Sequence, residues 1–319
     1  MKHQQPRTSL LLSVALATLL FAWSGVASAA PFAAKRIPAQ ADGVAHVDMD
    51  KLRASSFWQA IVKQLPAEAQ AGIKEDVSKQ ILKSLEDLGE DGLVAVAGSV
   101  MAATKSLTVW GDDNDRWALL IELPQASTMM SLVKGAAKFK TTKKKGVTLY
   151  HLGDDAFLSV HANILIVSEH ADAVVATARV QSGKGKSLTS RKLGKINTSS
   201  KKGILFVAGF GGKLLETFKK SAASAALQAD IRSVVLFVGE HGGSFFAEAE
   251  AQVKSPEEAT NLASVATGLL GLASLSNDDP DVATIISGLS IKAKGAALHA
   301  RLQLSAKTVK KFIADKRKP

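Results

Sequence analysis

Residues 107–137, LTVWGDDNDRWALLIELPQASTMMSLVKGAA, read as a strand, a polar turn, a second strand, a proline and a helix. The same order returns in residues 234–268, VVLFVGEHGGSFFAEAEAQVKSPEEATNLASVATG. Apolar residues alternate along the second strand of both copies, over 117–123 and 245–253, and successive strand side chains point to opposite faces. Each copy is therefore predicted to form an antiparallel hairpin that buries one face.

The flanking sequence extends this similarity to two larger units. Residues 41–52, ADGVAHVDMDKL, predict a strand that runs into a helix, and residues 204–210, ILFVAGF, open the second half in the same way. The predicted fold class is α+β, with two similar units that each form a mainly antiparallel sheet with helices packed on one face. The units are predicted at 41–180 and 203–319, and a basic linker at 181–202 joins them.

The N-terminus has the pattern of a cleaved signal peptide over residues 1–29. Lys2 and Arg7 precede an apolar run from Ser9 to Trp23, and Ala27-Ser28-Ala29 fits a cleavage site. The alternative is a membrane anchor, but the apolar run is shorter than the roughly 20 residues that span a bilayer. We expect a periplasmic or extracellular protein without a transmembrane anchor after cleavage, and residues 30–40 are predicted to form a loose leader.

Composition excludes several classes of protein. The chain has no cysteine, which rules out disulfides, thiolate metal sites and a cysteine nucleophile. Lys and Arg together number 40 against 29 Asp and Glu. Because Lys2 and Arg7 lie in the signal, the mature chain keeps 38 basic residues and a net charge of +9. A basic exported protein can meet anionic envelope polymers or lipid head groups, although the charge also serves solubility.

The basic charge is concentrated in the predicted linker. This segment lacks acidic residues and contains Lys184, Lys186, Arg191, Lys192, Lys195, Lys201 and Lys202. It is the predicted anion-binding segment, with Lys143, Lys144 and Lys145 as helpers; the alternative is a solvated linker. Aromatic residues do not alternate with these cations, so sequence-specific nucleic-acid binding is not expected.

One group of side chains suggests a metal. His46, Asp48 and Asp50 stand at alternate positions, so one strand face presents an imidazole and two carboxylates, which are metal-ligand types. The alternative is a strand end that turns into solvent, with Asp50 beginning a helix.

Other motifs fail on inspection. Gly185-Lys186-Ser187 looks like the end of a phosphate-binding loop, but Val180 stands where that motif needs glycine. No catalytic residues are assigned and no cofactor is expected. Trp117 shares the phase of the buried strand face, whereas the phase of Trp110 predicts exposure.

The opening of the mature domain resembles a family of exported bacterial proteins defined only as a domain of unknown function. The residues that carry the resemblance are Ala41, Asp42, Val44, Val47, Asp48, Lys51 and Leu52. The resemblance covers a dozen residues and implies no catalytic residues.

Two functions follow from these observations. The first is an exported, non-enzymatic binding or scaffolding protein of the bacterial cell envelope. The second is an envelope hydrolase or metal-dependent enzyme whose site is dispersed along the chain.

Overall fold

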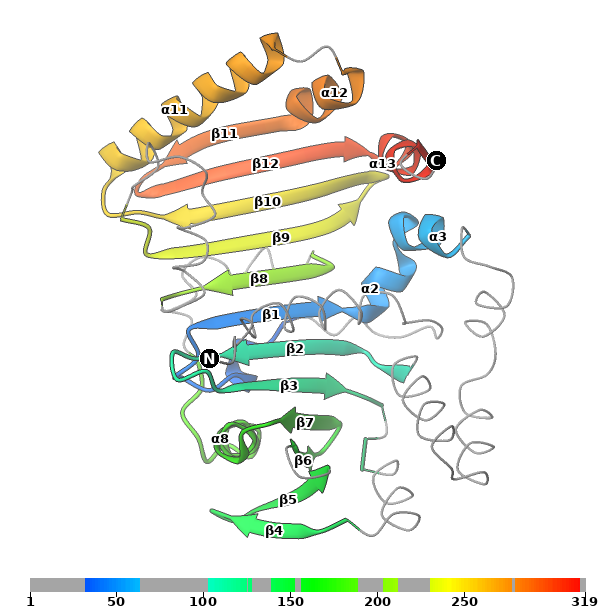
Figure 1. Ribbon diagram of the computed structural model, residues 1–319, viewed down its shortest axis with the longest axis vertical. Helices are drawn as coiled ribbons and strands as arrows, with labels where there is room; N and C mark the ends of the chain where they lie inside the picture. The colour runs from blue at the N-terminus through cyan, green and yellow to red at the C-terminus, as the bar shows by residue number, and fades with distance from the viewer. Residues whose placement is uncertain are drawn as a thin grey trace, which may run out of the picture.

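The computed structural model describes residues 32–63, 103–124, 126–127, 139–152, 156–188, 203–211, 230–276 and 279–315. Within these ranges, twelve strands form one antiparallel sheet, which runs the length of the molecule in Figure 1. The strand order is β11-β12-β10-β9-β8-β1-β2-β3-β7-β6-β5-β4.

The first seven strands precede residue 170 and the other five follow residue 204. Their bounds are β1 (Gly43–Asp48), β2 (Ser106–Gly111), β3 (Trp117–Glu122), β4 (Thr141–Lys144), β5 (Val147–Leu152), β6 (Ala156–His161), β7 (Ile164–Ser168), β8 (Leu205–Gly209), β9 (Ser233–His241), β10 (Ser244–Gln252), β11 (Leu289–Lys294) and β12 (Ala297–Ser305). Both hairpins predicted from the sequence are present, as β2–β3 and β9–β10.

The prediction of two similar units, each with its own sheet, is wrong. Strands β1 and β8 pair with each other in the middle of the sheet, with Gly43 opposite Gly209 and Val47 opposite Leu205. Strand β1 also pairs with β2, and β8 also pairs with β9, so neither has a free edge. The pairing satisfies backbone N–H and C=O groups of β1 and β8. Two separate sheets would leave these groups exposed at their edges. The class remains α+β.

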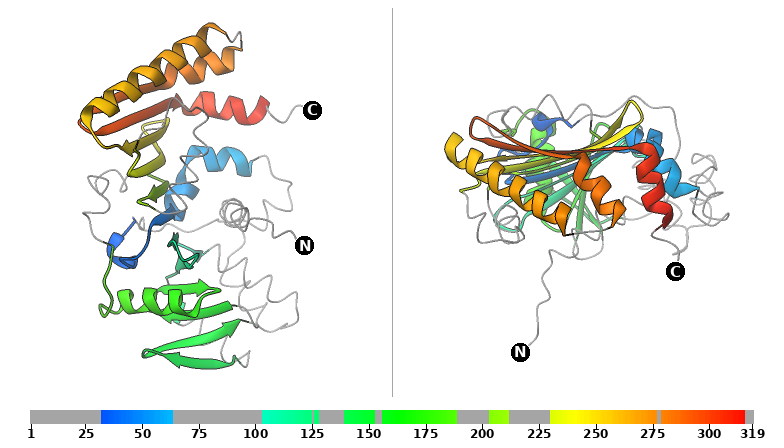
Figure 2. Two further views of the ribbon diagram at one scale, coloured as in Figure 1. Left: turned by 60° about the vertical axis from the view of Figure 1, so that its left-hand side comes forward. Right: turned by 90° about the horizontal axis from the view of Figure 1, so that it is seen from above.

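Helices pack at the ends and on the faces of this sheet (Figures 1 and 2). They are the 3-10 turn η1 (Ala34–Arg36) and the helices α2 (Met49–Ala54), α3 (Ser56–Val62), α8 (Ala171–Gln181), α11 (Pro256–Leu275), α12 (Pro280–Gly288) and α13 (Ala306–Asp315). Helix α8 packs on β5, β6 and β7, and α11 packs on the edge strand β11. The two helices therefore lie near opposite ends of the sheet.

Both faces of the sheet are buried in its middle. The main hydrophobic cluster contains Val44 and Trp110 on one face, and a second cluster contains Leu107 with partly buried Val47 on the other. Trp110 is 1% exposed, and its indole Nε1 donates to Thr177 Oγ1 of α8 at 2.9 Å. The predicted exposure of Trp110 is therefore wrong, because α8 and the residues before β1 cover the face that a one-sided hairpin would leave in water.

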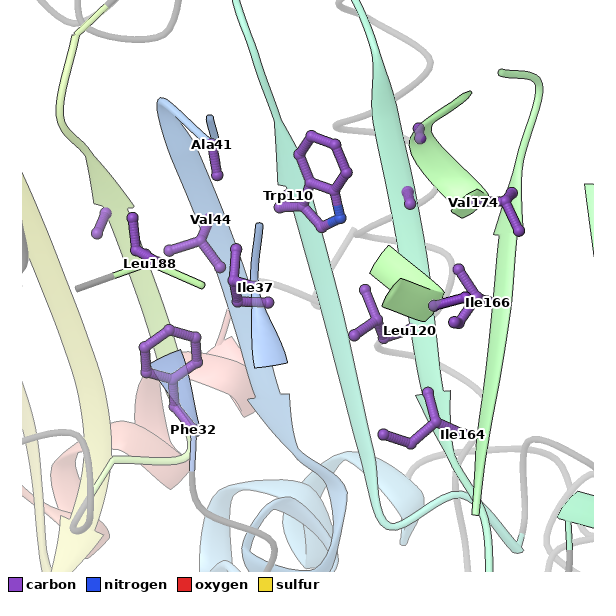
Figure 3. Packing of buried hydrophobic residues seen from close by; sticks show 14 of the residues in the cluster. Phe32, Ile37, Ala41, Val44, Trp110, Leu120, Ile164, Ile166, Val174 and Leu188 are labelled. Carbon is purple, nitrogen blue, oxygen red and sulfur yellow. The ribbon is translucent and has the colours of Figure 1, made fainter. Parts of the chain in front are cut away.

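The residues before β1 belong to the core, although composition predicted a loose leader. Phe32 and Ile37 are buried in the main cluster. Figure 3 shows Ile37 over β1, and Phe32 packs against His46 of β1 and Phe206 of β8. Backbone bonds join this segment to residues 186–188: Ala39 N donates to Lys186 O, and Leu188 N donates to Ile37 O. The N-terminal segment thus fixes the chain that leaves α8.

Candidate anion-binding site

A two-residue turn positions the first basic side chain of the candidate site. Strands β4 and β5 pair up to Lys144 and Val147, so Lys145 and Gly146 alone connect them. Both residues have positive φ, 51° and 79°, as a type I′ hairpin turn requires. The turn presents the Lys145 side chain, which is exposed, at one end of the hairpin.

The C-terminus of α8 positions two more cations. Gly183 has a φ of 72°, and its N–H donates to Val180 O, which turns the chain back over the last turn of the helix. Lys184 N then donates to Arg179 O at 2.8 Å, and Arg179 Nη2 donates to Lys184 O at 3.2 Å. Arg179 and Lys184 are therefore held beside each other by reciprocal bonds.

Gly185 lets this turn pack against the helix. A Cβ at position 185 would lie 2.9 Å from both the backbone N and the Cγ2 of Val180. Real side chains do not approach that closely, so any other residue would push the segment away from α8. The glycine consequently keeps Lys184 next to Arg179.

These elements enclose a pocket of about 330 Å³ between the C-terminal end of α8 and strands β5 and β6. Its lining includes the cations Lys145, Arg179 and Lys184 together with His161, and none of the lining residues is acidic. The full lining is Lys145, Gly146, Val147, Thr148, Tyr150, Ser159, Val160, His161, Ala178, Arg179, Ser182 and Lys184. Such a lining favours an anion, because neighbouring cations reinforce each other's potential.

An acidic side chain of α8 is already engaged by a lysine of the β4–β5 hairpin. Asp172, at the start of α8, pairs with Lys144 Nζ at 3.0 Å. The hydrogen bond from Lys144 lowers the pKa of the Asp172 carboxyl, and the charge of Lys145 contributes in the same direction. Lys144 therefore pairs with the Asp172 carboxylate, while the next residue, Lys145, lines the pocket.

One residue of the predicted anion-binding segment, Lys184, lines this pocket. Lys186 is exposed outside it, and its carbonyl accepts from Ala39 N at 3.0 Å. Arg191, Lys192, Lys195, Lys201 and Lys202 lie outside the described residues. Of the helpers, Lys145 lines the pocket. Sequence reasoning missed Arg179 and His161, because a single arginine near a helix end and a single histidine at a strand end carry no local signal.

The proposed metal ligands have separate partners in the structure. His46 Nδ1 lies 2.8 Å from Thr108 Oγ1, and its ring packs edge-on against Phe32 in the buried core. Asp48 caps α2 by accepting from Lys51 N and pairs with Lys51 Nζ at 3.3 Å. Across the described ranges, no three His, Asp or Glu side chains gather closely enough to hold a metal ion. The geometry gives the metal hypothesis no support.

Asp50, the third residue of that group, lies in a buried ion pair. Its Oδ1 is 3.7 Å from Arg53 Nη1, and the two side chains are 7% and 10% exposed. Burial raises the pKa of the Asp50 carboxyl above its ordinary value, and Arg53 opposes the shift. Burial also lowers the pKa of the Arg53 guanidinium, which donates to the Thr104 carbonyl. This buried pair lies within α2, next to the end of β1.

Comparison with known proteins yields only a distant likeness. No family model matches the chain, and no curated protein does. Among solved structures, crystal form III of TP0453 aligns with a TM-score of 0.47 and 12% identity over 91% of this chain and 100% of that one. Crystal form I of TP0453 gives 0.46 and 12% over 91% and 98%. The resemblance to a domain of unknown function stays a prediction.

Among the residues that the structure describes, none of the helices combines the length and apolar character needed to cross a bilayer.

Proposed function

We propose that this protein is an exported, non-enzymatic binding protein of the bacterial cell envelope that holds an anionic ligand at the pocket between α8 and β5–β6. One observation carries the proposal: Lys145, Arg179 and Lys184 come from a hairpin turn, a helix end and the following loop, yet line one pocket without an acidic residue. Envelope polymers and lipid head groups supply the complementary charge.

The alternative, a hydrolase or metal-dependent enzyme, finds less support in the geometry. Acid–base catalysis needs titratable groups that converge on a site open to substrate. The three carboxylates near the start of α2 are committed elsewhere: Asp48 caps α2, Asp50 faces Arg53, and Glu122 accepts from both Arg36 and Ser106. These carboxylates stabilise the junction between the N-terminal segment, β1 and α2.

Retention on an anionic matrix tests the proposal. The mature chain carrying Lys145→Asn, Arg179→Gln and Lys184→Ser should elute from a sulfated polysaccharide column at markedly lower salt than the unmodified chain, since exposed charges act through a screened potential. Asn is chosen at 145 because it accepts the left-handed conformation that Lys145 adopts.

The matched control removes three charges at the other end of the sheet. Lys292 and Lys294 of β11 and Lys307 of α13 are all exposed, and their replacement by Ser changes the net charge equally. This variant should elute close to the unmodified chain. Equal losses of retention in the two triple variants would show that net charge, rather than the pocket, governs binding and would defeat the proposal.

A further inference from the structure

The volume and the charge of the pocket restrict the class of ligand that it can bind. This inference rests on the function proposed above. Its volume of about 330 Å³ lies at the lower end of the range for small-molecule sites, which is about 300–1,000 Å³. A pocket of this size has room for one compact charged group, whether that group is free or part of a larger molecule. The ligand must therefore present its charge at one position.

The cations are suited to a group with more than one negative charge. Arg179 has a planar guanidinium whose Nη2 alone is committed, to the Lys184 carbonyl, among the described residues. Its remaining donors can form the paired bonds that guanidinium groups make to phosphate or carboxylate oxygens. Lys145 and Lys184 add two point charges that line the same space. Three cations exceed what a single carboxylate neutralises, but they match a phosphate monoester, which carries about −1.5 to −2 at neutral pH.

The positions of the charges are fixed by backbone interactions. The position of Lys145 is set by a hairpin turn in which both residues have positive φ. The position of Lys184 is set by hydrogen bonds from its N–H and to its carbonyl, both with Arg179 of α8. The segment beyond it is tied to the N-terminal residues by the bonds of Lys186 and Leu188. Because the backbone sets these positions, replacing one side chain removes its charge without removing the bonds that hold the site together.

Hydroxyl groups complete the wall but are partly engaged. Ser159 Oγ donates to Thr148 O, and Ser182 Oγ donates to Arg179 O. Both serine hydroxyls therefore donate to backbone carbonyls and not to a ligand, which leaves ligand recognition to the cationic side chains. We infer that the pocket binds a phosphate monoester group, carried by a small soluble molecule or by a lipid head group, through Lys145, Arg179 and Lys184.

Calorimetric titration of the mature chain at low ionic strength and pH about 7.5, where a monoester is a dianion, tests this inference. Glycerol 3-phosphate serves as the soluble probe, vesicles of phosphatidylcholine with phosphatidic acid as the lipid probe, and acetate as the monoanion. We expect binding of at least one phosphate probe and much weaker binding of acetate. Binding of both phosphate probes identifies the shared group as the ligand, and binding of the vesicles alone identifies the lipid as its source.

Single variants locate the site. Lys145→Asn, Arg179→Gln and Lys184→Ser should each weaken phosphate binding by about tenfold or more, as expected for loss of a hydrogen bond to a charged group. Lys143→Ser is the matched control, because Lys143 is exposed in the same hairpin and does not line the pocket. Unchanged circular dichroism would show that the variants remain folded.

Two outcomes would overturn the inference. Phosphate binding that survives all three pocket variants would place the ligand elsewhere. Failure of both phosphate probes to bind, while polysaccharide retention still depends on the pocket cations, would reject the phosphate monoester and leave the proposed function standing. Loss of both kinds of binding would reject the proposed function together with this inference.

Discussion

At the scale of single residues, burial changes the chemistry of the charged groups beside β1. Asp48, Asp50 and Arg53 lie at the junction of β1 and α2, where their side chains are largely removed from water. Burying a charge is unfavourable unless it is paired and hydrogen-bonded. Arg53 meets that need only in part, because its Nη1 lies 3.7 Å from Asp50 Oδ1 and neither carboxylate oxygen accepts a hydrogen bond. Asp48 and Asp50 look like potential metal ligands in the sequence, but in the fold they lie at the start of α2 and pair with Lys51 and Arg53.

Asp50 should leave a signature in the pH dependence of stability. Its pKa is raised above the ordinary value of 3.8 by burial. The folded chain then binds a proton more tightly than the unfolded chain, so the stabilising contribution is present below the unfolded pKa and is lost as pH rises through the folded pKa. We expect Asp50→Asn to flatten the decline of the free energy of unfolding above pH 3.8, measured by urea denaturation at a series of pH values.

Asp172→Asn provides the contrasting control. The bond from Lys144 lowers the pKa of Asp172, so its contribution is present above the unfolded pKa and is lost as pH falls through the folded pKa. The side chain is 54% exposed, and the effect should therefore be small. An unchanged slope in Asp50→Asn would contradict the assigned role of Asp50.

At the scale of elements, helix α11 has a well-capped start but is only partly buried along its length. Ser255 caps it by accepting from Glu258 N, and Pro256 occupies the first turn. Ala259 and Leu262 pack with Val253 near its start. Further along, Leu269, Leu272 and Leu275 are 49%, 64% and 85% exposed. The contribution of α11 to stability should therefore be concentrated in its first two turns.

Two substitutions in α11 separate its buried and exposed parts. Leu262→Ala should lower the free energy of unfolding by about 2–4 kcal/mol, because it opens a cavity between α11 and the sheet. Leu272→Ala should change it by less than about 0.5 kcal/mol, because that side chain is already in water. Chemical denaturation of both variants measures the difference. A comparable loss in the two variants would mean that the outer face of α11 is covered in solution.

At the scale of the whole molecule, the central β1–β8 pair makes the two halves of the chain parts of one structure. The main core contains Trp110 from the first half and Phe206, Val235 and Phe237 from the second. Neither half can bury these side chains alone. Among the described strands, continuous pairing from β11 to β4 leaves an open edge on the two outermost strands alone. Lysines on both, such as Lys143 and Lys292, discourage further pairing.

The shared core predicts one cooperative unfolding transition. The tryptophans beyond residue 29 are Trp58, Trp110 and Trp117. All three lie in the first half, so their fluorescence reports that half. Circular dichroism also reports α11, which belongs to the second half. The two signals should change at the same denaturant concentration, because unfolding one half exposes the core of the other. Separate midpoints would indicate that the halves unfold independently.

The sequence by itself determined the local elements. Alternating apolar residues and short polar turns located β2–β3 and β9–β10, and the proline after the second hairpin located the start of α11. These features depend on neighbours within a few residues, so period and capping are sufficient to predict them. The same reasoning found Lys184 and the helper Lys145, because both lie in visibly basic stretches.

Only the tertiary structure decided how these elements combine. The pairing of β1 with β8 joins residues about 160 positions apart, and the alternation within each strand is equally compatible with two sheets or one. That pairing, with α8 and the N-terminal segment packed above it, buried Trp110 and removed His46 from solvent. The pocket likewise unites Lys145 with Arg179 and Lys184, which only the contact between α8 and β5–β6 brings together. Non-local contacts of this kind depend on strand order and on the covering of each face, which no short stretch of sequence specifies.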